Sequence, residues 1–309
     1  MICESLLRML AQEHKVRKIE GEIITLGRQT IALTLSESLK ILREEGVHPT
    51  EDRIREAEKF GLDHITRYGK GAGVLTDKAL FALFGDNNLV AMDVSTYENA
   101  EIIHNLNFPI GVELENRFDF IIDGGTFDHL FDLKTAFGNL TKMLKVGGRT
   151  LMWNGASNFT GTAYMSFAPD FFRDYFLVNK YSDCKAYLAE VSRQGQFKKW
   201  NMFEYMGGRK FAEGMDAFHT PFMMMTIIVA EKGVETTHDL IPVQCFYRDD
   251  DRWQSYLDQE AIFKRSGRAS LKGNSKFALF KFLPRLAIFI AYMIHHRRRT
   301  SAYKYIGEI

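Results

Sequence analysis

Three short apolar runs in this sequence each end in residues that could bind a ligand. The runs and the residues that follow them are 22–26 with Gly27, 89–92 with Asp93, and 118–122 with Asp123 and Gly124. An aspartate in such a position can accept hydrogen bonds from both hydroxyls of a ribose, and a glycine lets the backbone approach a ligand closely. Because ligands of open parallel sheets bind outside the carboxyl ends of the strands, residues that follow separate runs can meet at one site.

These runs belong to a longer alternation of predicted strands and helices. Apolar residues recur at helical spacing over 30–46 and 133–144, between runs that are typical of buried strands. Strands that alternate with helices imply a parallel sheet with right-handed crossovers. Two later runs, 184–191 and 223–230, have no evident crossover helix between them and predict an antiparallel pair at one edge. The predicted fold is an α/β three-layer sheet, mostly parallel, with an antiparallel last strand.

Glycines and shifts in composition mark the predicted boundaries. Val146-Gly147-Gly148 is expected to end the helix before it, and the next strand is expected over 149–153. We predict one domain over 1–233, with an amphipathic N-terminal helix and an insertion near 47–85. A C-terminal extension over 234–309 is expected to follow.

The composition excludes several classes of protein. Of the 309 residues, 46% are apolar, which is enough for a sizeable core and excludes a largely disordered chain. The formal net charge of +1 gives no global field to attract nucleic acid, so we expect no nucleic-acid partner. The three cysteines form no C-x-x-C motif, so we expect no metal site and a reducing compartment. No signal peptide or spanning segment is evident, and we expect a cytoplasmic protein.

The ligand-site residues lie in stretches that match a known pattern. These stretches are LGRQ at 26–29, AMDVSTYENAEIIHNLNFPI at 91–110, FDFIIDGGTFDHLFD at 118–132, LKVGGRTLMW at 144–153, SFAPDFF at 166–172 and TIIVAEKG at 226–233. Together they make the chain resemble the class I S-adenosylmethionine-dependent methyltransferases, with their Rossmann-like sheet. The best match is a bacterial branch often encoded beside polysaccharide and glycan genes.

The resemblance implies that S-adenosyl-L-methionine is the cofactor and assigns its contacts. Gly27 and Gln29 would lie against the methionine part, and Asp93 would bind the ribose hydroxyls. The remaining cofactor contacts that it implies are Asn105 and Leu106 beside the adenine, with Asp123 and Gly124 below the cofactor at the end of a strand. Relatives commonly have aspartate at the position of Asn105.

The resemblance also implies methyl transfer to an acceptor. A methyl sulfonium is already activated, so the enzyme mainly aligns the acceptor, and a base is needed only for a protonated acceptor such as a hydroxyl. His129 is the first candidate for that base because it follows the end of a predicted strand, and Asp128 and Asp123 are weaker candidates. The branch suggests O-methylation of a saccharide, a glycan or another small acceptor. A packing or helix-start role for His129 is the alternative.

Two other functions stay open at this point. A nucleotide-dependent oxidoreductase is disfavoured by the absence of G-x-G-x-x-G and by the late antiparallel strand pair. A non-catalytic cofactor-binding or scaffold protein with the same fold remains an alternative.

The segment 276–299, KFALFKFLPRLAIFIAYMIHHRRR, has two interpretations. With lysine and arginine at the edges of an apolar stretch, it could lie on the anionic inner surface of a membrane. It could equally pack on the domain or on a second subunit, so a homo-oligomer is also left open.

Overall fold

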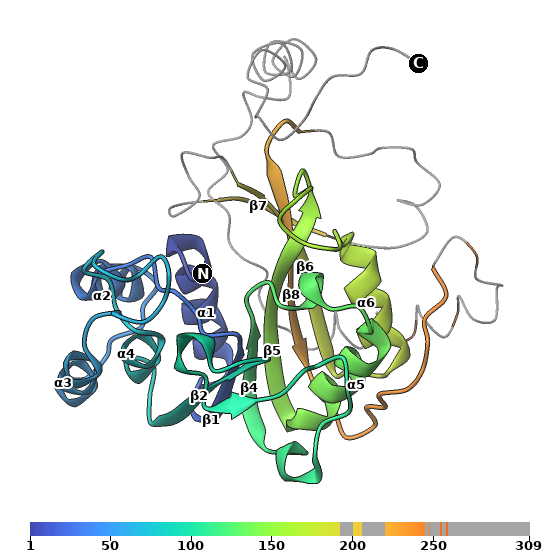
Figure 1. The fold of residues 1–309 in the computed structure, drawn as a ribbon, viewed down its shortest axis with the longest axis horizontal. Helices are drawn as coiled ribbons and strands as arrows, with labels where there is room; N and C mark the ends of the chain where they lie inside the picture. Colours follow the sequence, from blue (N-terminus) through green and yellow to red (C-terminus); the bar gives the residue numbers. More distant parts are fainter. Residues whose placement is uncertain (192–199, 206–219, 245–246, 248–253, 255–257, 259–309) are drawn as a thin grey trace.

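One mixed sheet with helices on both faces organises the chain (Figure 1). The computed structural model describes residues 1–191, 200–205, 220–244, 247, 254 and 258. The strand order is β3-β2-β1-β4-β5-β8-β6-β7. Neighbours from β3 to β5 pair in parallel, whereas β8 is antiparallel to both β5 and β6. This architecture confirms the predicted three-layer, mostly parallel sheet with an antiparallel last strand.

The elements have the following bounds. The strands are β1 Gly21–Leu26, β2 Asn87–Asp93, β3 Ile102–Ile103, β4 Phe118–Asp123, β5 Leu144–Ser157, β6 Asp183–Val191, β7 Asn201–Glu204 and β8 Met223–Glu231. The α-helices are α1 Glu4–Val16, α2 Leu35–Glu44, α3 Glu51–Phe60, α4 Asp77–Ala82, α5 Leu133–Met143 and α6 Pro169–Val178. Short 3-10 turns cover Tyr97–Asn99, Val112–Leu114 and Phe127–His129.

The central strands are buried on both faces, which explains their continuous apolar runs. Successive residues of a strand point to opposite faces, so Ile23 and Ile24 of β1 enter different cores. One core contains residues of α1, α2 and α4, and the other contains residues of α5 and α6. Figure 1 shows these two groups of helices on opposite sides of the sheet.

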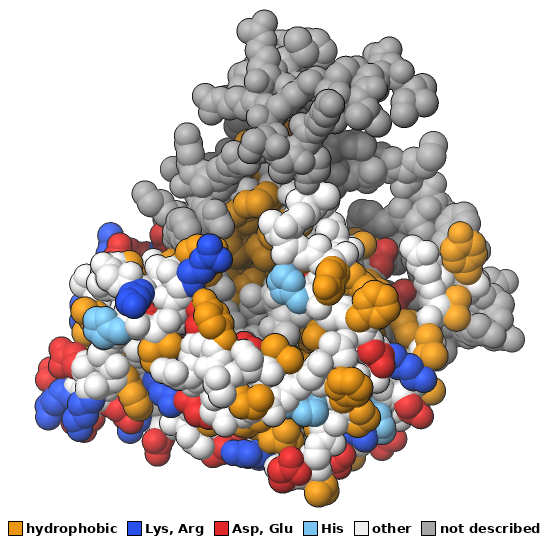
Figure 2. Space-filling view, viewed as in Figure 1, with side chains coloured by type: hydrophobic (Ala, Val, Ile, Leu, Met, Phe, Trp, Pro, Cys, Tyr) orange, Lys and Arg blue, Asp and Glu red, His pale blue; other side chains and the backbone are white. Residues whose placement is uncertain are grey.

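The segment predicted as an insertion, 47–85, forms α3 and α4. Leu80 and Phe81 of α4 are fully buried in the same core as α1. By contrast, α3 buries only Ala57, and its outer side carries charges of both signs (Figure 2, lower left). Threonine caps begin both helices, because the Thr50 and Thr76 hydroxyls accept hydrogen bonds from backbone N–H groups of the first turns.

Two details differ from the sequence prediction. Strand β5 begins at Leu144, so Val146-Gly147-Gly148 lies inside the strand and not between a helix and a strand. A Cβ on Gly148 would stand 3.0 Å from the Phe118 carbonyl oxygen, so glycine allows close strand approach here. The predicted antiparallel pair exists, but β7 adds a further strand beyond β6, so the pair is not at the edge.

The start of the predicted extension runs along α6. The Asn179 side chain donates to the Leu240 carbonyl at 3.0 Å, and the Tyr175 hydroxyl donates to the His238 carbonyl at 3.1 Å. The segment 276–299 lies outside the described residues. Among the helices that the structure describes, none has the length and apolar character needed to cross a membrane.

Candidate active site at the carboxyl ends of the strands

A cavity of about 360 Å³ opens at the carboxyl ends of β1, β2 and β4. It has the size of a small-molecule site and occupies the position where open parallel sheets bind ligands. Its lining residues are Gly27, Met92, Asp93, Val94, His104, Asn105, Leu106, Asn107, Gly125, Thr126, His129 and Leu130. The structure thus brings five of the residues predicted for the site, Gly27, Asp93, Asn105, Leu106 and His129, to one cavity.

Hydrogen bonds tie the three strand ends together around Gly27. The Gly27 N–H donates to the Met92 carbonyl at 2.7 Å, which joins β1 to β2. The Thr126 hydroxyl donates to the Leu26 carbonyl at 2.8 Å, which joins β1 to the segment after β4. Gly27 has a φ of +70°, a conformation that favours glycine, so the sharp turn after β1 depends on this residue.

Asp93 provides the acidic group of the cavity. Among the described residues, its carboxylate accepts one hydrogen bond, from the Ser95 N–H at 3.2 Å. An ionised carboxylate offers about four lone-pair sites. Most of the acceptor capacity of Asp93 therefore remains for a ligand that carries hydroxyl groups.

The loop after β3 also lines the cavity, and asparagine side chains hold this loop in place. The Asn105 Oδ1 accepts hydrogen bonds from the backbone N–H of Asn107 at 3.1 Å and from its Nδ2 at 2.8 Å. The Asn107 Oδ1 in turn accepts from the N–H groups of Phe131 and Asp132. With its oxygen engaged, Asn105 presents its amide NH₂ as a donor, which is a polarity that aspartate would not give.

The floor of the cavity is apolar. Met92, Leu106 and Leu130 are 1%, 5% and 7% exposed, and each also packs into the core beside α5 and α6. A flat, weakly polar ring fits against such a floor, while Asp93, Asn105 and Asn107 are more exposed than these apolar residues. This combination suits a ligand that joins an aromatic base to a hydroxylated sugar.

His129 and Asp128 form a pair on the 3-10 turn after β4. The His129 Nε2 lies 3.7 Å from the Asp128 Oδ1, which is longer than a hydrogen bond but close enough for attraction. The His129 side chain is 56% exposed, whereas that of Asp128 is 6% exposed and lies behind the cavity wall. Burial raises the pKa of Asp128, and the His129 charge acts in the opposite direction.

Two residues near the end of β5 form hydrogen bonds with Asp128. Its Oδ2 accepts from the Gly155 N–H at 3.3 Å, and its own N–H donates to the Asn154 side chain at 3.1 Å. Its Oδ1 has no hydrogen-bond partner within the described part of the chain. A buried carboxylate oxygen without a donor, aimed at a histidine, can stabilise the protonated imidazole.

The other predicted residues lie beneath the cavity and do not line it. Asp123 is fully buried, and its carboxylate accepts from the Thr126 N–H at 2.7 Å and the Asn154 Nδ2 at 2.6 Å. Burial raises its pKa to about 7, against the effect of these hydrogen bonds. Asp123 therefore shapes the turn that carries Thr126 and His129.

Gln29 and Gly124 form a packed contact under the same turn. The Gln29 Nε2 donates to the carbonyls of Leu26 at 3.3 Å and Gly27 at 3.0 Å. A Cβ on Gly124 would stand 2.0 Å from the Gln29 Oε1, so a side chain there would displace the end of Gln29. Gln29 also borders a separate cavity of about 190 Å³ on the side of α4.

Several residues in and around the cavity escaped the sequence analysis. Thr126 and Asn107 are polar neighbours of predicted positions, and only their contacts in the fold distinguish them. Asn154 could have been found, because it directly follows the predicted strand over 149–153 just as Asp93 follows its own run. Within the described residues, no group of three or more His, Cys, Asp or Glu side chains could hold a metal ion.

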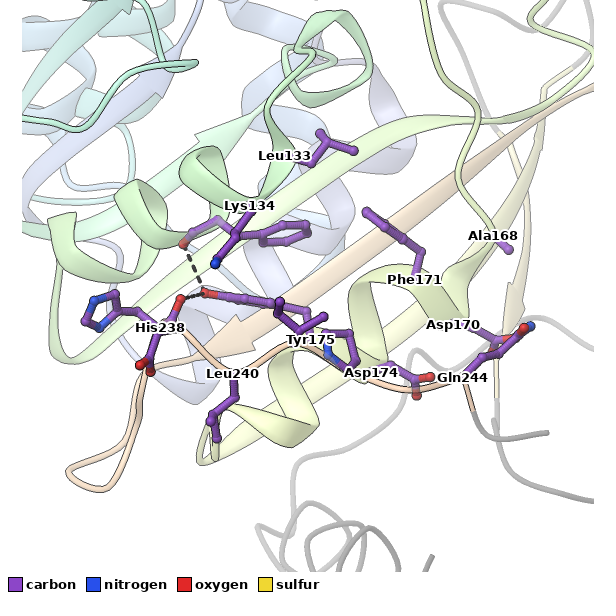
Figure 3. A pocket seen from close by; sticks show the side chains of 14 residues that line it. Leu133, Lys134, Ala168, Asp170, Phe171, Asp174, Tyr175, His238, Leu240 and Gln244 are labelled. Atoms are coloured by element: carbon purple, nitrogen blue, oxygen red, sulfur yellow. Dashed lines mark hydrogen bonds between the residues drawn. The ribbon is translucent and has the colours of Figure 1, made fainter. Parts of the chain in front are cut away.

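A second cavity, of about 490 Å³, lies between α5, α6 and residues 238–244 (Figure 3). Phe171 and Tyr175 of α6 face it together with Leu133 of α5. The Tyr175 hydroxyl is already bonded to the carbonyls of Phe137 and His238. This cavity is mainly apolar and lies on the helical layer, so we place the active site at the strand ends instead.

The chain was compared with protein-family models, with curated proteins and with solved structures, and only the solved structures gave matches. No protein-family model matches the sequence, and no curated protein matches it. An N1-methyltransferase of 1,6-didemethyltoxoflavin from Burkholderia thailandensis, solved with that compound and S-adenosylhomocysteine, is 10% identical, with a TM-score of 0.36 over 74% of this chain and 78% of that chain.

Two further structures are those of S-adenosylmethionine-dependent methyltransferases. One, from Thermotoga maritima and described as a possible histamine N-methyltransferase, is 14% identical over 74% of this chain and 91% of that chain, with a TM-score of 0.34. The other, from Archaeoglobus fulgidus, is 10% identical over 72% and 94%, with a TM-score of 0.36. Likenesses at this level carry no functional argument, which must come from the geometry of the site.

Proposed function

We propose that this protein transfers a methyl group from S-adenosyl-L-methionine to a hydroxyl group of a saccharide or another small acceptor. The observation that supports the proposal best is the cavity at the strand ends. An acidic residue, Asp93, and an apolar floor at Leu106 lie in the same cavity as His129, which is backed by a buried carboxylate.

The cavity residues fit the adenosine part of this cofactor. Asp93 would accept hydrogen bonds from the ribose hydroxyls, and the apolar floor would pack against the adenine ring. Asn105 would donate from its amide to a ring nitrogen of the base. The turn at Gly27 has no side chain, so a ligand can approach its backbone closely.

When bound, S-adenosyl-L-methionine supplies a methyl group already activated by the positive sulfur. The chain has to hold the acceptor oxygen in line and remove its proton. In our proposal the Nε2 proton of His129 points to Asp128, which leaves Nδ1 to accept the proton from the acceptor hydroxyl. Asp128 would then stabilise the imidazolium that forms. This use of a base favours a hydroxyl acceptor over one that carries a free lone pair.

The saccharide rests on the sequence resemblance to the polysaccharide-associated branch. We further propose that residues 1–233 form the catalytic unit, that 234–309 form an extension and that the protein acts in the cytoplasm. Contact of 276–299 with the inner membrane surface, its packing on protein, and a homo-oligomer stay predictions.

Calorimetric titration of the purified protein with S-adenosyl-L-methionine and S-adenosylhomocysteine tests the proposal, with NAD as a control. We expect micromolar binding of the first two ligands and none of NAD. Failure of both to bind would refute the proposal, and binding of NAD would favour an oxidoreductase. Cofactor binding without methyl transfer to any member of an acceptor library would favour the non-catalytic alternative.

A further inference from the structure

Another cavity, of about 310 Å³, lies near the amino ends of β1 and β2, opposite the strand ends that carry the candidate active site. It is enclosed by the end of α1, the loop into α3 and the residues just before β2, and we call it the α1–α3 cavity. Its lining residues are His14, Lys15, Lys18, Gly46, Val47, His48, Pro49, Thr50, Arg53, Leu83, Phe84 and Gly85. Because β1 and β2 begin beside it, it is separate from the cavity at their carboxyl ends.

The lining is rich in basic residues. Five of its residues, His14, Lys15, Lys18, His48 and Arg53, are basic and none is acidic. The whole chain has a formal net charge of only +1, so this concentration is local and does not reflect a general excess of cations. Arg53 pairs with Glu56 at 2.6 Å and with Asp86 at 3.7 Å, whereas the structure shows no ion pair for the two lysines within its described residues.

Among the described residues, the buried His14 side chain has a donor that meets no acceptor. Its side chain is 4% exposed, and its Nδ1 accepts a hydrogen bond from the Ile19 N–H at 3.1 Å. A backbone N–H is always a donor, so the proton of a neutral His14 must sit on Nε2. Burial lowers the pKa of His14 to about 4, assisted by the charges of Lys18 and Arg149, so the ring is neutral at pH 7.

The group next to the Nε2–H of His14 is a second hydrogen-bond donor, the ammonium group of Lys18. The Lys18 Nζ lies 3.2 Å from the His14 Nε2, and an ammonium group has no acceptor to offer. An anionic oxygen that accepts from both groups would satisfy the buried N–H and the lysine together. The arrangement therefore calls for an anion between His14 and Lys18.

We propose that the α1–α3 cavity binds the phosphate group of an organic phosphate. A phosphate offers several oxygens in a tetrahedral arrangement, so it can accept from His14, Lys18 and Lys15 at once. The apolar walls formed by Val47 and Phe84 would contact the organic part of the ligand. A soluble phosphate ester and the headgroup of an anionic lipid share this chemistry.

Calorimetry of the full chain with pyrophosphate and phenyl phosphate tests the site. We expect dissociation constants on the order of 1 mM or tighter. The double variant Lys15→Gln/Lys18→Gln should weaken binding about tenfold or more, because charge-assisted hydrogen bonds are lost. The matched control Lys40→Gln/Lys59→Gln removes the same charge from α2 and α3 outside the cavity and should bind normally. No binding to the wild type, or equal weakening in both variants, would overturn the proposal.

The wild type offers a test that does not depend on the folding of a variant. In ¹⁵N spectra of the histidine rings, phosphate should shift the Nε2 signal of His14 and leave its Nδ1 bonded as before. An unchanged signal at saturating pyrophosphate would contradict the proposal.

Vesicles containing phosphatidic acid, compared with phosphatidylcholine vesicles, distinguish the two sources of phosphate. Lysine-dependent binding to the phosphatidic acid vesicles that pyrophosphate displaces would support the site and indicate a lipid. Binding of the free phosphates alone would support the site and indicate a soluble ester.

Discussion

Replacement of Asp93 by alanine removes the acidic group of the candidate active site and leaves the rest of the cavity in place. Within the part of the chain that the structure describes, the Asp93 carboxylate accepts one hydrogen bond, from the Ser95 N–H, so its loss removes little from the fold. A hydrogen bond to a charged group contributes about 1.5–3 kcal/mol. We therefore expect the affinity for S-adenosyl-L-methionine to fall by about 10- to 150-fold.

The assay is the calorimetric titration with S-adenosylhomocysteine, which binds without turnover. Asp93→Asn is the matched control, because it keeps the shape and one acceptor oxygen while removing the charge, and it should lie between the wild type and Asp93→Ala. Thermal unfolding shows whether each variant is folded. Unchanged affinity in a folded Asp93→Ala protein would remove Asp93 from the site and refute the assignment of this cavity to a ribose.

His129→Ala should leave cofactor affinity nearly normal and lower methyl transfer by about 10²- to 10⁴-fold, and full activity would exclude His129 as the base. Because the pKa of His14 is about 4 in the folded state, against 6.5 as its ordinary value, its neutral form stabilises the fold above pH 6.5 and this stability is lost as the pH falls toward 4. The free energy of unfolding, measured in urea, should therefore fall with pH more steeply for the wild type than for His14→Gln, and parallel curves would contradict this. Gly124→Ala should destabilise the protein by about 1–3 kcal/mol, because the new Cβ meets Gln29. Calorimetric melting should show this loss reduced in a Gln29→Ser background, and equal losses in both would show that Gln29 is not the obstacle.

The central strands were predictable because burial on both faces leaves a mostly apolar run, as in FDFII before Asp123. The start of β5 was not predictable, because Val146-Gly147-Gly148 has the composition of a helix end. Only the approach of the Phe118 carbonyl shows why glycine stands inside a strand. The strands β3 and β7 have two and four residues and no buried side chain, so they lack the apolar pattern on which the prediction depends.

For the site, the expectation that ligands bind at the carboxyl ends of parallel strands correctly grouped Gly27, Asp93 and His129 around one cavity. It could not determine which way each side chain points. Asp123 turns inward because the Thr126 N–H and the Asn154 side chain bind its carboxylate. The first of these contacts is local, but the second comes from β5, about thirty residues further along the chain, and no local pattern encodes it.

The place of β8 between β5 and β6 affects how the chain can fold during synthesis. The ribosome completes β6 at Val191, but the strand that joins it to β5 ends only at Glu231. Until then, β5 and β6 each have an unpaired edge, and an edge of this kind can pair with another chain. A nascent chain that stalls within this interval thus exposes two strand edges, which a chaperone could shield from pairing with other chains.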